Sequence, residues 1–310
     1  MAEDRGLVAE TATETAVVQH RGKSPTLIID CNYVCHVVRY ALNGTQMHYN
    51  GRDTAIIYGF MCRLRDFLIR FSPKRVAFCW DSPNSARRAL DPAYKAARHR
   101  TAQTDEELQE AASAYEQFTH IRTKLLPKLG FVNNFMADGY EGDDLIAGLV
   151  KGRMNPDHCF VVSGDNDLYQ LLEWCSLYLL RKHELYTWRD FEAEYGVPPR
   201  LWTAVKALAG CSGDGVAGLP GIGVRTAVKY LRGELGFGEK RRRIEGEGGQ
   251  ASWQNAYPLV ALPFAGTPVY KIRRDKTVTR ERFASICRYY GFHSFMSPMA
   301  LGQWSVMFTA

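Results

Sequence analysis

Three apolar runs of this chain each close on an aspartate, and this recurrence restricts its fold more than any other feature. The runs begin at residues 26, 75 and 159 and end at Asp30, Asp81 and Asp165. Shorter apolar candidates lie at 131–135 and 176–180. Continuous apolar runs separated by helical patterns are typical of strands buried on both faces of a parallel sheet. The sequence therefore predicts an α/β fold, with a mostly parallel sheet flanked by helices.

Helical patterns fill the spaces between these runs. The clearest helix begins at Thr104, which forms a capping-box signature with Glu107 three residues later. The residues before it, 81–101, are rich in Arg, Lys and Ala and have no apolar face, so we expect them to be exposed and mobile. Beyond 198 helical patterns dominate, and the glycine-rich residues 233–250 are interpreted as an insertion loop. Residues 1–24 have no periodicity and are interpreted as a mobile tail.

Composition narrows the class of protein. With 310 residues and 46% apolar residues, the chain predicts a soluble globular protein with a substantial core. Its net charge of +6 permits a polyanionic partner without requiring one. The eight cysteines form no CxxC pair, which argues against a structural zinc site and favours a cytoplasmic location. We find no apolar run of membrane-spanning length and no signal-peptide core, so no membrane association is expected.

Acidic residues follow the predicted strands at one edge of the sheet. Open parallel sheets bind ligands beyond the carboxyl ends of their strands, where Asp30, Asp81 and Asp165 fall. Asp167 would point to the same side as Asp165 if the chain is still extended there. A further group, Glu141, Asp143 and Asp144, stands at the start of a predicted helix. Each acid alone has an ordinary explanation, because aspartates commonly end strands and begin helices.

The convergence of these acids is more informative than any one of them. Seven carboxylates at one sheet edge would repel each other and raise each other's pKa values. Divalent Mg²⁺ or Mn²⁺ relieves that repulsion, since both prefer oxygen ligands, and no histidine cluster indicates zinc. Two such ions about 4 Å apart suit phosphodiester hydrolysis. The sequence therefore predicts a metal-dependent phosphodiesterase site.

Basic residues fall in the segment that begins beside this edge. They are Arg87, Arg88, Lys95, Arg98 and Arg100. Such a run is usually a solvated loop, but a cation-rich segment beside an anionic site would draw phosphate towards it. Tyr94 could stack on a base.

A glycine-rich turn supplies a second phosphate-binding candidate. Residues 218–223 read Gly-Leu-Pro-Gly-Ile-Gly and lead into a predicted helix that carries Arg225 and Thr226. Glycines expose backbone amides, and with a helix N-terminus these amides hold phosphate without reading bases. The pattern indicates a helix-hairpin-helix in which Gly221, Ile222 and Gly223 form the turn.

Together these motifs resemble the flap endonuclease / 5′→3′ exonuclease family, especially its stand-alone phage and bacterial members. The resemblance runs from about residue 26 to 295 and rests on Glu-Gly-Asp-Asp at 141–144, Ser-Gly-Asp-Asn-Asp at 163–167, and Gly-Asp at 213–214 leading into the hairpin. Pro-Ala-Tyr-Lys at 92–95 and Cys-Arg-Tyr-Tyr-Gly-Phe at 287–292 also resemble family motifs. The resemblance implies a PIN-like nuclease domain over 25–198 with a helical arch at about 82–103, and a helical DNA-binding region over 199–310.

The resemblance also implies residue roles. The first metal would be held by Asp30, Asp81, Glu141, Asp143 and Asp165, with Asp144 and Asp167 nearby. Lys95 and Arg98 would contact the scissile phosphate, and these two together with Asp30, Asp81, Asp143 and Asp165 would form the catalytic group. DNA contacts would come from Tyr94, Arg87, Arg88, Lys206, Gly221, Ile222, Gly223, Arg225 and Thr226. A K⁺ ion at the hairpin carbonyls would accompany Mg²⁺ or Mn²⁺.

One departure from the family pattern concerns the second metal. The family usually shows Gly-Asp-x-x-Asp-Asn before the hairpin, whereas this chain has Cys211, Asp214 and Gly215 at the last three signature positions. Asp214 is kept, but a thiol is a poor Mg²⁺ ligand, so the second site is expected to be weakened.

The expected partner is DNA with a 5′ flap or 5′ end, or the RNA primer of a hybrid, bound by a monomer in the cytoplasm. Two other functions remain open. A PIN-like ribonuclease is disfavoured by the arch and hairpin, which RNA-cutting relatives generally lack. A branched-DNA binding protein with weak catalysis is favoured by Cys211 alone.

Overall fold

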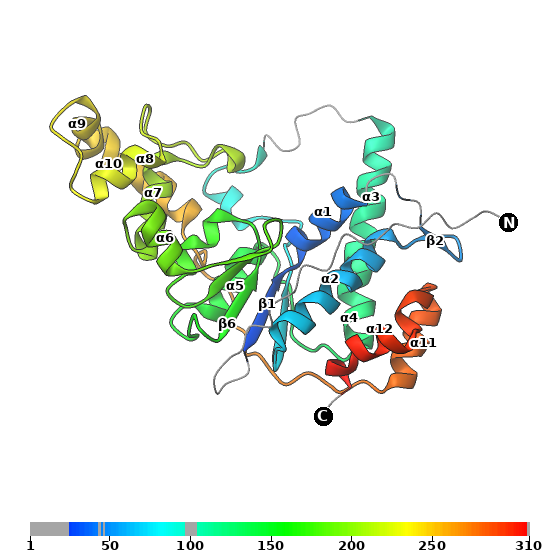
Figure 1. Ribbon diagram of the computed structural model, residues 1–310. Helices are drawn as coiled ribbons and strands as arrows, with labels where there is room; N and C mark the ends of the chain where they lie inside the picture. The colour runs from blue at the N-terminus through cyan, green and yellow to red at the C-terminus, as the bar shows by residue number, and fades with distance from the viewer. Residues whose placement is uncertain (1–24, 43–44, 46, 97–103, 309–310) are drawn as a thin grey trace.

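A six-stranded sheet forms the centre of the protein, with helices on both of its faces (Figure 1). The computed structural model describes residues 25–42, 45, 47–96 and 104–308. The strand order is β5-β4-β1-β6-β7-β8, and β8 alone runs antiparallel to its neighbour. The strands are β1 (Thr26–Asp30), β4 (Arg75–Cys79), β5 (Asn134–Phe135), β6 (Cys159–Val162), β7 (Ser176–Leu179) and β8 (Glu184–Tyr186). The predicted mostly parallel sheet is therefore confirmed.

The apolar runs form strands because both faces of the sheet are covered. Leu27 and Ile29 of β1 point into one hydrophobic cluster, and Ile28 between them points into the other. The first cluster lies under α1 (Cys31–Ala41), α2 (Ala55–Phe71) and α3 (Asp105–His120). The second lies under α5 (Gly142–Val150), α6 (Trp188–Tyr195) and α7 (Trp202–Ala209). Alternation of side chains along a buried strand explains why the runs are apolar throughout.

The remaining helices lie on the two sides of the sheet. The predicted capping box of Thr104 and Glu107 is present at the start of α3, and a π-helical turn (Ile121–Leu125) and α4 (Leu126–Lys128) continue that helix. On the α7 side lie α8 (Val224–Leu231), α9 (Glu239–Glu245) and α10 (Glu247–Val260). On the α2 side lie α11 (Arg280–Tyr290) and α12 (Pro298–Gln303). In the described residues we find no helix that is long and apolar enough to cross a bilayer.

Some expectations about local structure were wrong. The hairpin β2 (His48–Tyr49) and β3 (Arg52–Asp53) was not predicted, because both strands are only two residues long. Residues 239–245 and 247–250 are helical instead of a loop, since Ile244 and Gly249 pack into the protein. At Gly249 a Cβ atom would lie 2.1 Å from the carbonyl oxygen of Ile244, so this glycine permits close packing and does not signal a loop.

The boundary at 198 does not separate two hydrophobic cores. Trp202 and Val205 share a cluster with Ile28 of the sheet. Phe283 and Trp304 share the other cluster with Leu27. The helical region after 198 therefore packs on both sides of the sheet, and the division into 25–198 and 199–310 stays a prediction. The predicted tail, 1–24, lies outside the described residues.

Candidate functional site

Asp30 stands at the carboxyl edge of the sheet, where β1 passes directly into α1. It is the last residue of β1 and the N-cap of α1, and its Oδ1 accepts from the Tyr33 amide at 3.0 Å. Its Oδ2 accepts from the hydroxyl of Ser163 at 2.7 Å. Asp30 is 7% exposed, so both oxygens are held in a nearly buried site.

Ser163 joins the loop after β6 to the end of β1. Its hydroxyl oxygen also accepts from the amide of Asp165 at 3.2 Å, so one side chain orients two of the predicted metal ligands. Asp165 caps the 3₁₀ turn Asn166–Leu171 and accepts from the Asp167 amide at 2.8 Å. The chain is thus no longer extended at Asp167, which lies in the 3₁₀ turn. Ser163 stood within a recognised motif, but nothing in the sequence assigned it this role.

Asp81 follows β4 and is held against the start of α5. Its Oδ1 accepts from the amide of Gly142 at 2.7 Å, and the side-chain oxygen of Asn32 accepts from its own amide at 3.1 Å. A Cβ atom at Gly142 would lie 3.0 Å from this Oδ1, which favours glycine between Glu141 and Asp143. The Glu-Gly-Asp spacing therefore lets the α5 N-terminus approach the end of β4 closely.

The electrostatics of this edge agree with a cation site. Burial, and next the charge of Asp81, raises the pKa of Asp30 to about 7. Burial also raises the pKa of Asp143 well above its usual range, with Asp165, Asp30 and Asp81 adding to the effect. Carboxylates that hinder each other's ionisation are a donor set that a hard divalent ion would stabilise. Within the described ranges, no three of these four acids have ligand atoms all within 4.8 Å of one another, so a bound ion would draw the side chains closer together.

Glu141 is paired with the base of the predicted arch. Its Oε2 lies 2.7 Å from Nζ of Lys95 and accepts from the Tyr94 hydroxyl at 3.1 Å. Burial would raise the pKa of Glu141, but Lys95 and then Arg87 outweigh it and hold that pKa below its usual value. Lys95 itself has a left-handed backbone, φ +55°, and its amide donates to the carbonyl of Asp214 at 2.8 Å.

Two residues assigned to DNA are buried in this region, so those assignments were wrong. Tyr94 is 2% exposed and packs with Ala207 and Val216, so its ring cannot stack on a base in this arrangement. Arg87 is 1% exposed and donates to Asp144 through contacts of 2.6 and 2.7 Å. The expectation that this segment is exposed throughout therefore fails at both residues. Arg88 is exposed, and its role as a DNA contact stays a prediction.

Asp144 is likewise not available to a metal ion. Besides Arg87, its oxygens accept from the amides of Phe264 at 2.8 Å and Glu141 at 3.1 Å, and its side chain is fully buried. A carboxylate saturated by four donors has a structural role. The assignment of Asp144 to the metal site is therefore wrong. Asp144 instead holds the guanidinium of Arg87 in place.

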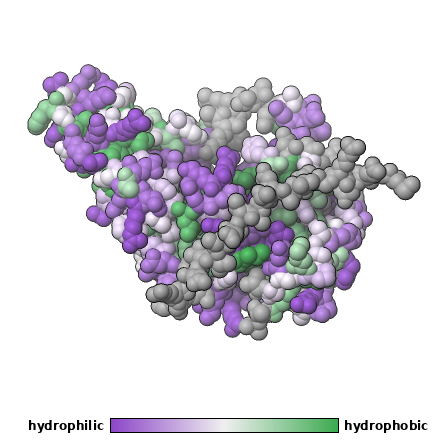
Figure 2. All heavy atoms as spheres, in the orientation of Figure 1, coloured by the Kyte–Doolittle hydropathy of each residue, from purple (hydrophilic) through white to green (hydrophobic). Residues whose placement is uncertain are grey.

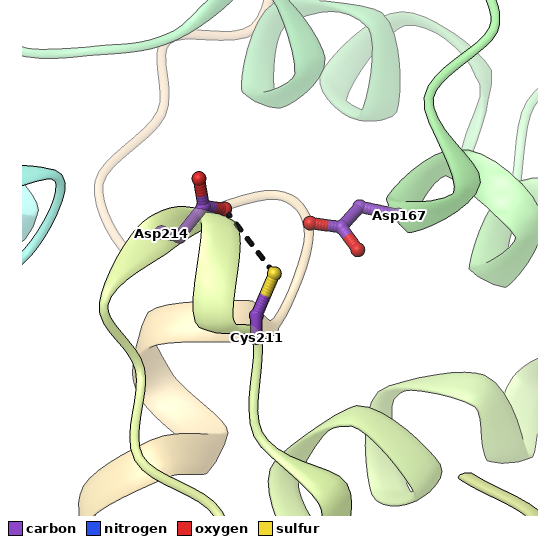
Figure 3. A group of neighbouring side chains, drawn as sticks. All are labelled: Asp167, Cys211 and Asp214. Atoms are coloured by element: carbon purple, nitrogen blue, oxygen red, sulfur yellow. Dashed lines mark hydrogen bonds between the residues drawn. The ribbon is translucent and has the colours of Figure 1, made fainter. Parts of the chain in front are cut away.

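A second cluster lies beside the first and contains Asp167, Cys211 and Asp214 (Figure 3). One ligand atom from each lies within 4.8 Å of the others, and the Cys211 thiol donates to Asp214 at 3.6 Å. Asp214 belongs to the short 3₁₀ turn Ser212–Asp214, while Asp167 comes from the turn after β6.

Lys206 places a cation in this second cluster. Its Nζ lies 2.6 Å from Asp167 Oδ1, 3.0 Å from the side-chain oxygen of Asn166 and 3.8 Å from the Cys211 sulfur. Burial alone would lower the pKa of Lys206. The charge and hydrogen bond of Asp167, together with Cys211 and Asp165, outweigh burial and raise that pKa, so the ammonium stays charged. With 7% of its surface exposed, Lys206 contacts these side chains in place of the predicted phosphate.

The glycine hairpin has the expected form. Ile222 is buried and its amide donates to Leu219 O at 3.0 Å, whereas Gly221 and Gly223 are exposed on either side. Helix α8 begins directly after Gly223, with Arg225 exposed and Thr226 partly exposed in its first turn. At Gly218 a Cβ atom would lie 2.2 Å from the carbonyl carbon of Ala209, so the turn packs closely on α7. Arg98 and Arg100 lie outside the described residues.

Comparisons with known proteins agree on one family. Residues 25–196 match the model of a family described as 5′-3′ exonuclease, N-terminal resolvase-like domain. Over 204 residues the chain is 35% identical to a 5′-3′ exonuclease of Bacillus subtilis, covering 62% of this chain and 65% of that protein. Over 206 residues it is 31% identical to the thermostable DNA polymerase I of Thermus filiformis, covering 66% of this chain and 23% of the polymerase. The chain thus spans less than two thirds of the length of these relatives.

Solved structures show the same fold. T5 5′-exonuclease with bound divalent metal ions (zinc) matches with a TM-score of 0.64 at 21% identity, over 77% of this chain and 89% of that one. Flap endonuclease-1 from Methanococcus jannaschii matches with a TM-score of 0.56 at 14% identity, over 92% of each chain. At these identities the likeness concerns the arrangement of the elements.

Proposed function

Because this chain belongs to the 5′-3′ exonuclease family, we propose that it is a structure-specific 5′ nuclease, a flap endonuclease and 5′→3′ exonuclease. It would hydrolyse DNA phosphodiesters near junctions between single-stranded and duplex DNA. The observation that carries the proposal is the gathering of Asp30, Asp81, Asp143 and Asp165 at one sheet edge, beside Lys95. The carboxylates come from four separate elements at this edge, and this supports the proposal because open parallel sheets bind ligands beyond the carboxyl ends of their strands.

A divalent cation, Mg²⁺ or Mn²⁺, is part of this proposal. Asp30, Asp81, Glu141, Asp143 and Asp165 would hold it, and Asp167 and Asp214 would contribute to a second, weaker site. The bound ion would supply Lewis acidity for the attack of water on phosphorus. The raised pKa values of Asp30 and Asp143 support this assignment, since these side chains are held where their charge is unfavourable without a cation.

Lys95 is proposed to place the scissile phosphate. Its ammonium lies between the first cluster, through Glu141, and the second, through Asp214 at 3.9 Å. Its left-handed backbone is fixed by the carbonyl of Asp214, and such strained positions are concentrated at functional sites. A cation held between two anionic clusters can transfer its contact to a phosphate oxygen once the carboxylates bind metal. Arg98 is proposed as its partner on the same segment.

The hairpin is proposed to bind duplex DNA away from the cut. Exposed Gly221 and Gly223 present backbone at the N-terminus of α8, and Arg225 adds a positive charge in the first turn. Backbone contacts of this kind hold phosphate without reading sequence. The substrate would therefore be selected by its shape.

A second candidate is a branched-DNA binding protein with weak catalysis. The thiol of Cys211 and the ammonium of Lys206 in the second cluster favour it, because neither is a Mg²⁺ ligand. A monomeric state and a cytoplasmic location stay predictions from the sequence.

The deciding experiment is cleavage of a 5′-labelled flap DNA across a Mg²⁺ titration, repeated with Mn²⁺, EDTA and single-stranded RNA. Cutting at the junction that requires metal and spares RNA would support the nuclease. The matched control is Asp143→Asn, which keeps the size of the side chain and should abolish cutting while flap binding persists. Tight flap binding by the unaltered protein without product in either metal would select the weak-catalysis alternative.

A further inference from the structure

Helix α9 contacts the tip of the glycine hairpin through one arginine. The guanidinium of Arg243 donates to the carbonyl oxygen of Pro220, within the hairpin turn. The same guanidinium pairs with Glu239 one helical turn earlier, which fixes its direction. The contact joins residues 23 positions apart, so it is a tertiary feature of this fold.

The position of Arg243 relative to Gly221 shows where its charge lies. Gly221 has φ +77° and is exposed, and a Cβ atom there would lie 3.2 Å from a terminal nitrogen of Arg243. The Arg243 side chain keeps 38% of its surface exposed. Its positive charge therefore lies beside the exposed part of the hairpin and remains open to a phosphate approaching that turn.

The surroundings of Arg243 favour a polyanion. Residues 240–243 are four consecutive cations, against two carboxylates at Glu239 and Glu245 in the same helix. Helix α9 lies at the protruding end of the molecule, next to α8 and α10 (Figure 1). Figure 2 shows that this end is mainly hydrophilic. A basic helix packed against a phosphate-binding turn extends the surface that a duplex backbone would follow.

A monovalent ion at the hairpin fits this arrangement poorly. The K⁺ that the family resemblance implies would be held by hairpin carbonyls, and the carbonyl of Pro220 already accepts from a guanidinium. A second cation beside the same oxygen would be repelled by the fixed charge of Arg243. The residues at this turn therefore do not fit the expected K⁺ ion.

We propose that Arg243 takes the place of the monovalent cation at the hairpin, so this chain binds duplex DNA without requiring K⁺. The guanidinium holds the turn through Pro220 and supplies the positive charge that accompanies the hairpin amides on a phosphate. Arg243 is a positioning residue in this account, and the inference rests on the proposed binding of DNA by the hairpin.

The test is the affinity for flap DNA, measured by fluorescence anisotropy with Ca²⁺ in place of Mg²⁺ so that no product forms. Binding is compared at equal ionic strength in KCl, NaCl and N-methyl-D-glucamine chloride, whose cation is too large for a carbonyl site. The unaltered protein should bind with the same Kd, within about twofold, in all three salts. Arg243→Met should lose about tenfold in the glucamine salt and regain most of that loss in KCl.

Arg242→Met is the matched control, because it removes the same charge from an exposed neighbour in α9. Arg242→Met should lose less affinity for flap DNA than Arg243→Met, and its loss should be equal in all three salts. The inference is overturned if the unaltered protein binds several-fold more tightly in KCl than in the glucamine salt. It is equally overturned if Arg243→Met loses the same factor in every salt, since a purely structural or long-range charge effect has no preference for K⁺. Should Arg243→Met fail to fold, the salt series on the unaltered protein still decides.

The measurements distinguish a wrong role for Arg243 from a wrong nuclease function. A protein that cleaves flap DNA but needs K⁺ for binding refutes only the role of Arg243. A protein that binds no flap DNA in any salt refutes the proposed function itself.

Discussion

The guanidinium of Arg87 and the carboxylate of Asp144 meet through two N–H···O contacts of 2.6 and 2.7 Å across 57 positions of sequence. Both side chains are nearly without solvent exposure. Because Asp144 lies in the first turn of α5, the pair ties the base of the arch segment to the helix that presents Glu141 and Asp143. This buried ion pair therefore helps to position Lys95 relative to Glu141 and Asp143.

Breaking this pair should destabilise the fold. We expect Arg87→Met to lower the free energy of unfolding by about 3–5 kcal/mol, because it leaves the Asp144 charge buried and unpaired. Urea denaturation followed by circular dichroism measures the change. Arg88→Met, one residue along and exposed, should change it by less than about 0.5 kcal/mol. Equal effects of the two substitutions would contradict the structural role of Arg87.

Lys95→Ala should lower turnover of flap DNA more than affinity. The ammonium is expected to contact the phosphate as it reacts, so its loss removes stabilisation made mainly in the transition state. Single-turnover cleavage and anisotropy measured on the same substrate separate the two quantities. Lys95→Arg keeps the charge and should retain more of the turnover. Unchanged turnover with weakened binding would show that Lys95 is only a docking charge.

Cys211→Asp should strengthen the second cation site. It replaces the sulfur, which lies 3.8 Å from the Lys206 ammonium and 3.6 Å from Asp214, with an oxygen ligand, and hard cations prefer oxygen to sulfur. The Mg²⁺ concentration needed for half-maximal cleavage should fall. Cys62→Asp adds the same charge at a cysteine outside the cluster and should not lower it. A Mg²⁺ titration unchanged by Cys211→Asp would place Cys211 outside the site.

Asp30→Asn should stabilise the metal-free protein at high pH only. Burial and Asp81 raise the pKa of Asp30 to about 7, whereas an unfolded aspartate titrates near about 4. The folded protein therefore loses stability as pH rises through that interval, and a neutral side chain avoids the loss. In EDTA the melting temperature should rise at pH 8 by several degrees and change little at pH 4. A rise of the same size at both pH values would show that charge is not the cause.

The sequence was sufficient to predict the sheet and the acidic residues at its carboxyl edge. The strands ending near Asp30, Asp81 and Asp165 followed from local apolar patterns, and the α5 start at Gly142 from its acidic first turn. The predicted PIN-like fold and membership of the nuclease family are confirmed by the comparisons. These features depend on short stretches of sequence, which is why they could be predicted.

The roles of Arg87, Tyr94 and Lys206 could not be predicted in this way. Each polar side chain has a partner at least 39 positions away in sequence: Asp144 for Arg87, Glu141 for Tyr94 and Asp167 for Lys206. A basic or aromatic residue in a polar stretch looks like a surface contact until that partner is known. Helix α9 was missed for a related reason, since its packing on the hairpin is tertiary and its glycine-rich flank favoured a loop.

The hydrophobic cluster shared by Leu27, Phe60 and Trp304 has a consequence for the synthesis of the chain. One face of the sheet stays partly open to water until the residues around Phe283 and Trp304 have left the ribosome. All of the proposed metal ligands and the hairpin have emerged before then. Because long-range contacts form slowly, the last helices would complete the core after every reactive group is in place. Nascent chains halted before α11 would thus carry a full set of catalytic side chains on an unfinished core, a state open to proteolysis.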